Sequence, residues 1–301
     1  MTKLIATSVV RGSQQGESHG GVYLIDFATE HVQQVIDWNT AAIDWQGRGW
    51  DRGLRGISFD GNRLFIAASD ELFEYDSDFN LVNSYRNAYL KHCHEICVYR
   101  RRLYLTSTGY DAILGFDLDT NKFCFGLSIV DIGMDVQAAP FNPLSNAGPS
   151  PRNFLHLNNV FCNADGMYIS GLKTAGVLRF LGNSIQRWVT LPLGIHNAQP
   201  YQQGVLFNDT AADLVRYVTE SSQQAFRVPD IAPTQLDLAD NRIARVGFGR
   251  GLCVVLDSLV AAGSSPSTIA LHDLKKNKTL KTVTLSYDVR NAIHGLEVWP
   301  F

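Results

Sequence analysis

Side chains that are cationic or bind metals recur at the start of short apolar runs along this chain. Each run reads as a cation, a variable residue, a small or apolar residue, a polar residue and then usually valine. The six leading residues are His294, Arg55, His94, His156, His196 and Arg242. Four of the eight histidines stand in this column, and no acidic or apolar residue does. The column predicts a site for a metal ion or an anion.

The order along the chain separates two kinds of chemistry. The three histidines that lead consecutive runs are His94, His156 and His196. Three neutral imidazoles suit a catalytic zinc, or a non-haem iron with open positions. Arg55 and Arg242 flank His294, and a guanidinium binds carboxylate or phosphate through paired hydrogen bonds. These residues predict a divalent transition metal facing an anion clamp, which would position and polarise a small anionic substrate. Convergence of all four histidines on one metal is an alternative.

Neighbouring residues extend this candidate site. Glu95 follows His94 and would orient an imidazole or act as a base; with His294 it forms the predicted catalytic pair. Trp45 and Trp50 would stack on a substrate, or else fill an apolar contact with another loop. Further oxygen ligands are offered by Asn158, Asn159, Asn208 and Asp209. Such oxygens favour Ca²⁺ as the alternative cofactor, although an Asn-Asp pair also caps turns.

A structural role for the column is equally consistent with the pattern. Repeats share residues by descent, and a recurring His or Arg can hydrogen-bond the backbone of the neighbouring repeat. Under that interpretation the ring of cations is structural, or binds an anionic ligand or peptide without turnover.

The elements that must position the column form a repeat. Runs of four to six alternating residues are separated by turn residues, with almost no helical periodicity. Four such runs make one unit, which is clearest between residues 53 and 87. Six units predict an all-β, six-bladed β-propeller in a single domain over residues 1–301. The predicted blades are 292–301 with 3–38, then 54–87, 94–130, 155–191, 195–229 and 241–287.

The two ends of the chain each offer a strand that lacks a partner nearby in sequence. Residues 291–301 and residues 3–10 therefore predict a pairing that completes the first blade. In the last blade we expect residues 242–246 as the first strand and 251–256 as the second. Residues 131–153 and 258–267 are expected to be long loops, the former a possible lid.

Composition narrows the class of protein. The net charge of −3 and the pI near 6.2 argue against nucleic acid as a partner. Arg100, Arg101 and Arg102 form the single basic run, which we interpret as a solvated turn between strands. No apolar run approaches 18 residues, so no membrane span is expected. Oligomeric state is not predicted.

The five cysteines are an odd number without a CxxC pair. They fit buried free thiols in a reducing compartment. No charged segment followed by an apolar one marks a signal peptide at the N-terminus. A cytoplasmic protein is the expectation.

Short motifs at the blade starts resemble a family of uncharacterised bacterial propeller proteins. They are residues 55–61, 156–160 and 196–210. The resemblance implies a propeller without an established activity. Residues 158–159, 163–166 and 208–209 are also similar to the Asn and Asp ligand segments of the regucalcin and gluconolactonase superfamily, which implies a six-bladed, metal-dependent lactonase. The departure is that those sites use oxygen ligands, whereas this column holds histidine and arginine.

The function expected from the sequence is a metal-dependent enzyme of lyase or hydrolase type that acts on a small anionic metabolite. In it, the three consecutive histidines bind the metal, while Arg55, Arg242, Trp45 and Trp50 bind the substrate. The alternative is a non-catalytic propeller that binds an anionic ligand or peptide.

Overall fold

The short apolar runs form strands throughout the residues that the computed structural model describes, which are 3–14, 16–38, 53–132, 135–236 and 244–301. In hydrogen-bonded order, the first sheet is β25 (Asn291–Val298), β1 (Lys3–Val10), β2 (Gly20–Asp26) and β3 (His31–Asp37). The second is β4 (Ile57–Asp60), β5 (Arg63–Ala67), β6 (Glu71–Tyr75) and β7 (Leu81–Arg86). The third is β8 (Ile96–Tyr99), β9 (Arg102–Ser107), β10 (Ala112–Asp117), β11 (Lys122–Ile132) and β12 (Asp135–Phe141).

The remaining sheets have four strands each. The fourth is β13 (Leu157–Asn163), β14 (Gly166–Gly171), β15 (Gly176–Leu181) and β16 (Ser184–Thr190). The fifth is β17 (Ile195–Tyr201), β18 (Gly204–Asp209), β19 (Leu214–Thr219) and β20 (Gln223–Arg227). The sixth is β21 (Arg250–Leu256), β22 (Leu259–Ser264), β23 (Thr268–Asp273) and β24 (Lys278–Thr284). Two 3-10 helices are η1 (Thr108–Tyr110) and η2 (Pro233–Gln235).

These sheets confirm the predicted all-β, six-bladed β-propeller. The burial of the strands explains the pattern read from the sequence. The third strand β6 is buried along its whole length, whereas the fourth strand β7 is almost entirely exposed. Fourth strands such as β24 therefore carry polar residues at every second position or more.

Two details of the blade assignment differ from the prediction. Residues 251–256 lie in the first strand of the sixth sheet, not the second, and residues 259–264 form a strand where a loop was expected. Residues 135–141 likewise form a fifth strand, β12, rather than part of a long loop. Both errors arose because strand-length runs rich in Ala, Gly, Pro and Ser carry a weak strand signal.

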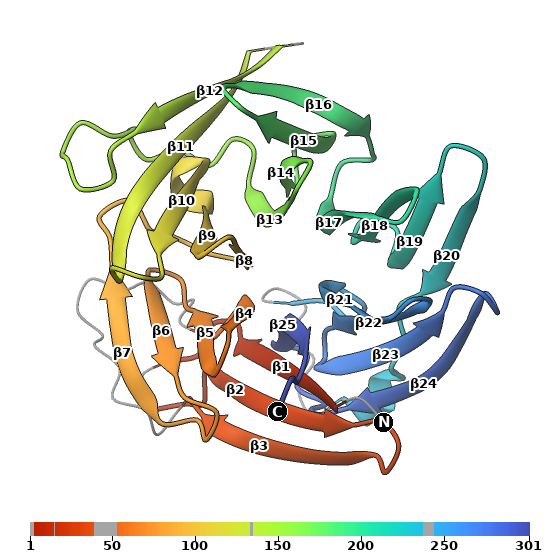
Figure 1. Ribbon diagram of the computed structural model, residues 1–301. Helices are drawn as coiled ribbons and strands as arrows, with labels where there is room; N and C mark the ends of the chain where they lie inside the picture. Colours follow the sequence, from red (N-terminus) through yellow and green to blue (C-terminus); the bar gives the residue numbers. More distant parts are fainter. Residues whose placement is uncertain (1–2, 15, 39–52, 133–134, 237–243) are drawn as a thin grey trace. The chain divides into compact units, whose positions relative to one another are not determined.

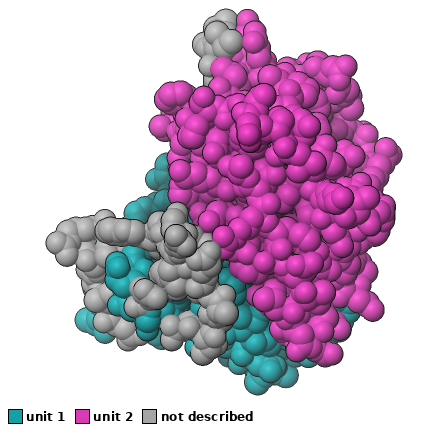
Figure 2. Space-filling view, turned by 90° about the vertical axis from the view of Figure 1, so that its left-hand side faces the viewer, with its two compact units in different colours: residues 1–57, 208–301 teal, residues 58–207 magenta. Residues whose placement is uncertain are grey.

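The chain divides into two compact units, residues 1–57 with 208–301 and residues 58–207, which Figure 2 shows in two colours. The prediction of one domain over the whole chain stays a prediction. In the first unit the C-terminal strand pairs with the N-terminal strand, as predicted: Leu4 stands opposite Val298, and Val9 opposite Ala292 (Figure 1). Ile293 and Leu296 of β25 enter the same buried apolar cluster as Leu4 and Ile25.

Glycines on β21 and β25 permit close approach of neighbouring backbone in this unit. A Cβ at Gly295 would lie 2.2 Å from the carbonyl oxygen of Arg55. One at Gly251 would lie 2.7 Å from that of His294. Gly251 follows Arg250 and Gly295 follows His294 in the sequence. The glycine after the leading residue of a run therefore allows neighbouring backbone to pack closely.

A partly buried carboxyl group on β25 makes the stability of the first unit depend on pH. Burial raises the pKa of Glu297 to about 7. Since the folded-state pKa exceeds that of the unfolded chain, the stability contributed by the neutral carboxyl is present below about pH 4.5 and is lost as the pH rises through about 7.

Glu297→Gln should therefore stabilise the protein increasingly as the pH rises from about 4.5 to about 7, and by a constant amount above that. The stabilisation is the free energy of unfolding of the variant minus that of the wild type. We expect it to be about 1–2 kcal/mol larger at pH 8 than at pH 4.5. Urea denaturation at both pH values measures this difference. The exposed Glu220→Gln is the control, and an equal effect of the two substitutions would show that Glu297 does not titrate as described.

Two apolar clusters hold the second unit together. One joins Phe65 and Leu72 to Leu105 and Phe116, and the other joins Ile113 and Leu127 to strands β13 and β14. The five cysteines are free, as expected; Cys93, Cys162 and Cys253 are buried, but Cys97 is only partly buried and Cys124 is exposed. In the described part of the chain, no helix has the length and apolar character needed to cross a membrane.

Candidate functional site

Three of the predicted histidines gather in the second unit. The ring centroids of His94 and His156 lie 5.3 Å apart in an edge-on arrangement, and those of His94 and His196 lie 6.3 Å apart. His94 and His196 are buried, whereas His156 is partly buried. The residues come from three successive sheets, so the cluster forms where the first strands begin.

Threonine 106 fixes the backbone that carries the first histidine. Its hydroxyl oxygen accepts the backbone N–H of His94 at 2.9 Å and that of Glu95 at 3.1 Å, and the hydroxyl donates to the Glu95 carbonyl at 3.1 Å. Thr106 is fully buried on β9. The segment that enters β8 is thereby held through a side chain before the strand pairing begins.

Asp111 positions the second histidine in a similar way. Its carboxylate accepts backbone N–H groups from Phe154 at 2.6 Å, from Leu155 at 3.1 Å and from His156 at 3.1 Å. Burial raises the pKa of Asp111, and these N–H groups oppose the rise. His156 itself has a φ of 52°, a conformation that costs a non-glycine residue energy. The carboxylate thus compensates a strained backbone beside the cluster.

Glu95 reaches a residue far away in the sequence. The Asn197 side-chain amide donates to Glu95 Oε1 at 2.9 Å, across a separation of 102 residues. Asn197 is buried and has a φ of 53°, a left-handed conformation that asparagine tolerates better than most residues. The hydrogen bond orients the Glu95 carboxylate beside the histidine cluster.

The predicted asparagine ligands have structural partners. Asn158 Nδ2 donates to the Ile195 carbonyl at 2.8 Å, and Asn159 Nδ2 donates to the Ala198 carbonyl at 2.9 Å. In the first unit, Asp209 accepts the backbone N–H of Ala212 and pairs with Arg216 at 2.9 Å. Asp209 therefore caps the turn, whereas Asn208 Nδ2 donates to the Gly251 carbonyl at 3.2 Å. Calcium as a cofactor remains a prediction.

The spacing of the imidazoles fits a metal only in part. Two imidazoles bound to one tetrahedral metal place their ring centroids about 5 Å apart. The His94–His156 separation agrees with this value, while the His94–His196 separation is longer. No three His, Cys, Asp or Glu side chains among the described residues are arranged to hold a metal ion. Coordination by all three histidines requires the His196 ring to turn toward the other two.

The first unit holds the arginines of the column. Arg55 and His294 are buried, with exposed fractions of 0% and 2%. His294 Nε2 is hydrogen-bonded to Nη1 of Arg250, the first residue of β21. Arg242, Trp45 and Trp50 lie outside the described residues.

Arg250 is the site residue that the sequence reasoning missed. It leads the first strand of the sixth sheet, the place that the prediction gave to Arg242. The signal was present in the dipeptides Arg55-Gly56, Arg250-Gly251 and His294-Gly295. It was passed over because residues 251–256 were placed in the second strand.

Further guanidinium groups surround Phe248 in the first unit. Those of Arg11, Arg245 and Arg250 lie 4.9, 5.2 and 4.7 Å from its ring centroid. Arg245 also pairs with Asp213 at 2.5 Å. Such a group of cations on one aromatic ring favours binding of an anion.

Solved structures with this fold have diverse names. A chain of the nidogen/laminin complex is 8% identical, with a TM-score of 0.61 over 99% of this chain and 98% of that chain. A protein of unknown function from Bacteroides caccae is 9% identical, with a TM-score of 0.59 over the whole of both chains. A streptogramin B lyase is 9% identical, with a TM-score of 0.52 over 83% of this chain and 94% of that chain.

These likenesses show the fold alone: the chain is a six-bladed β-propeller with a buried histidine cluster. No family model matches the sequence. No curated protein matches it either.

Proposed function

We propose that this protein is a metal-dependent enzyme of lyase or hydrolase type, acting on a small anionic metabolite. The observation that carries the proposal is the gathering of three imidazoles from three successive blades, two of them buried and that of His156 partly buried. Imidazole nitrogens are common ligands of zinc and of non-haem iron in proteins. A streptogramin B lyase has the same fold, and this supports a lyase activity by analogy only.

The residues of the cluster have distinct roles in this proposal. A divalent metal held by His94, His156 and His196 would act as a Lewis acid on a substrate oxygen. Glu95, oriented by Asn197, accepts a proton from the substrate or from water and returns it to the leaving group.

Metal content tests the proposal. Protein purified without a histidine tag should contain about one equivalent of zinc or iron by mass spectrometry. His94→Ala and His156→Ala should each lower that content at least about tenfold, because a three-ligand site does not survive loss of a ligand. Metal removal should also lower the melting temperature of the wild type but not that of the variants.

His272→Ala is the control, since this buried histidine lies outside the cluster and is hydrogen-bonded to Thr279 at 3.0 Å. Metal-free wild-type protein, with melting unchanged by added zinc or iron and by the cluster substitutions, would refute the metal site. The similarity to gluconolactonases would instead be supported by calcium that remains bound in both cluster variants.

The second candidate is a binding protein without turnover, favoured by the three guanidinium groups around Phe248. It predicts stabilisation by inorganic phosphate that survives chelation and is lost in Arg250→Gln.

A further inference from the structure

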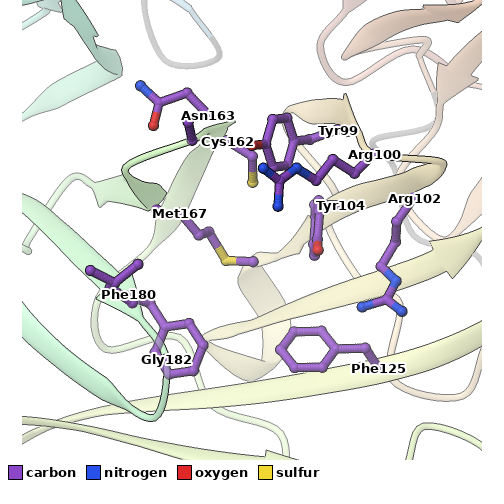
Figure 3. A pocket seen from close by; sticks show the side chains of 13 residues that line it. Tyr99, Arg100, Arg102, Tyr104, Phe125, Cys162, Asn163, Met167, Phe180 and Gly182 are labelled. Atoms are coloured by element: carbon purple, nitrogen blue, oxygen red, sulfur yellow. The ribbon is translucent and has the colours of Figure 1, made fainter.

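A cavity of about 310 Å³ lies in the second unit, away from the histidine cluster. It is lined by the last residues of β8 and β13, namely Tyr99, Cys162 and Asn163 (Figure 3). His94 and His156 precede the opposite ends of the same two strands. Since β13 has seven residues, the cavity and the cluster are about 20 Å apart.

Aromatic side chains form much of the cavity wall. Tyr99, Tyr104, Phe125 and Phe180 line it, and Met167 lies among them (Figure 3). Tyr104 and Phe125 meet edge-on, with their ring centroids 6.3 Å apart. A volume of this size, with flat apolar walls, suits a small molecule that contains one or two aromatic rings.

The charged residues of the cavity wall are arginines. Arg100 and Arg102 line it, and no aspartate or glutamate is among its described lining residues. The guanidinium group of Arg100 lies 5.1 Å from the ring centroid of Tyr99. The intervening Arg101 pairs instead with Asp60 at 2.7 Å and Asp119 at 2.6 Å. Arg101 is therefore held by two carboxylates away from the cavity. Arg102 borders the cavity beside Tyr104 and stands opposite Asp117 of β10, and Arg100 borders it beside Tyr99.

The turn that presents these arginines is strained. Arg100 and Arg101 form the two-residue connection between β8 and β9, with φ values of 50° and 61°. Asn-Gly is the usual solution for such a turn, because positive φ is costly for a long side chain. The turn holds Arg100 at the border of the cavity and Arg101 away from it.

We propose that this cavity binds a planar aromatic molecule that carries a carboxylate. The ring lies against the aromatic wall, and the carboxylate pairs with Arg100 and Arg102. Such a ligand matches both the shape and the positive charge of the cavity. This binding site is independent of the proposed metal chemistry, because neither arginine touches the histidine cluster.

Calorimetric titration with 2-naphthoate tests this site. We expect binding at a dissociation constant of about 1 mM or lower, and at least about tenfold weaker binding of the uncharged 2-naphthamide. Arg100→Gln and Arg102→Gln should each weaken 2-naphthoate binding about tenfold. Arg101→Gln, in the same turn but off the cavity, is the matched control and should stay within about twofold.

Other variants separate this proposal from the metal site. His94→Ala, and chelator-treated wild type, should bind 2-naphthoate within about twofold of the untreated protein. Since Arg100→Gln alters a strained turn, circular dichroism accompanies it, and Arg102→Gln on β9 tests the charge independently. Equal binding of acid and amide, equal loss in all three arginine variants, or no binding near 1 mM would overturn the proposal.

Discussion

A chain that ends at Asn291 is expected to lose its folded monomeric state. Residues 292–298 of β25 pair with β1 along almost its whole length, and Ile293 and Leu296 are buried in the first unit. Burial of each such side chain contributes about 1.5–3 kcal/mol. Together with the lost strand pairing, their removal approaches the total stability of an ordinary domain, about 5–15 kcal/mol.

The loss should be visible in both stability and oligomeric state. Without β25, the backbone groups of β1 become an open edge, which favours pairing with another chain. Circular dichroism and light scattering should report an unfolded or associated protein. The control chain ends at Trp299, which keeps the hydrogen bond from the Trp299 N–H to the Lys3 carbonyl at 2.9 Å. That chain should lose no more than about 1 kcal/mol; a monomeric, cooperatively melting chain ending at Asn291 would contradict the role of β25.

Asp111→Asn should destabilise the second unit by about 2–4 kcal/mol and disturb the histidine cluster. The amide keeps the size of the side chain and tolerates the φ of 45° at this position. It replaces one accepting oxygen with a donor, which then faces the N–H of Phe154 or His156 and also the buried N–H of Leu155. A buried donor left without an acceptor costs about 1–3 kcal/mol, and the opposed donors add to that cost.

The zinc affinity of the Asp111→Asn variant shows whether Asp111 positions His156 or only stabilises the fold. At a temperature where the variant remains folded, we expect its affinity for zinc to fall about tenfold or more. Asp117→Asn is the matched control, because Asp117 also accepts a backbone N–H, that of Thr120 at 2.8 Å, but in an exposed turn. Equal zinc affinity of the two variants would show that Asp111 is structural only, whatever the change in melting.

The histidine column could be predicted from the sequence because the start of a strand is marked by residues that are neighbours in the chain. His94, His156 and His196 stand at equivalent positions of a repeat, and the structure brings their rings together. Their metal remains a prediction, as do the roles of Glu95 and Arg55. The first strand of the sixth blade begins at Arg250 rather than Arg242, and the error arose because the run Leu259–Ser264 was not recognised as a strand. An anion-binding role for either arginine remains a prediction.

Local pattern thus determined the strands, the number of blades and the pairing of the chain ends, because alternation and turn residues depend only on sequence neighbours. The tertiary structure decided which side chains meet. The contact between Asn197 and Glu95 joins residues 102 positions apart, and Asp111 holds His156 from 45 positions away. Such contacts depend on how neighbouring sheets pack and on the exact register of each first strand, and these are properties of the assembled core rather than of any single run.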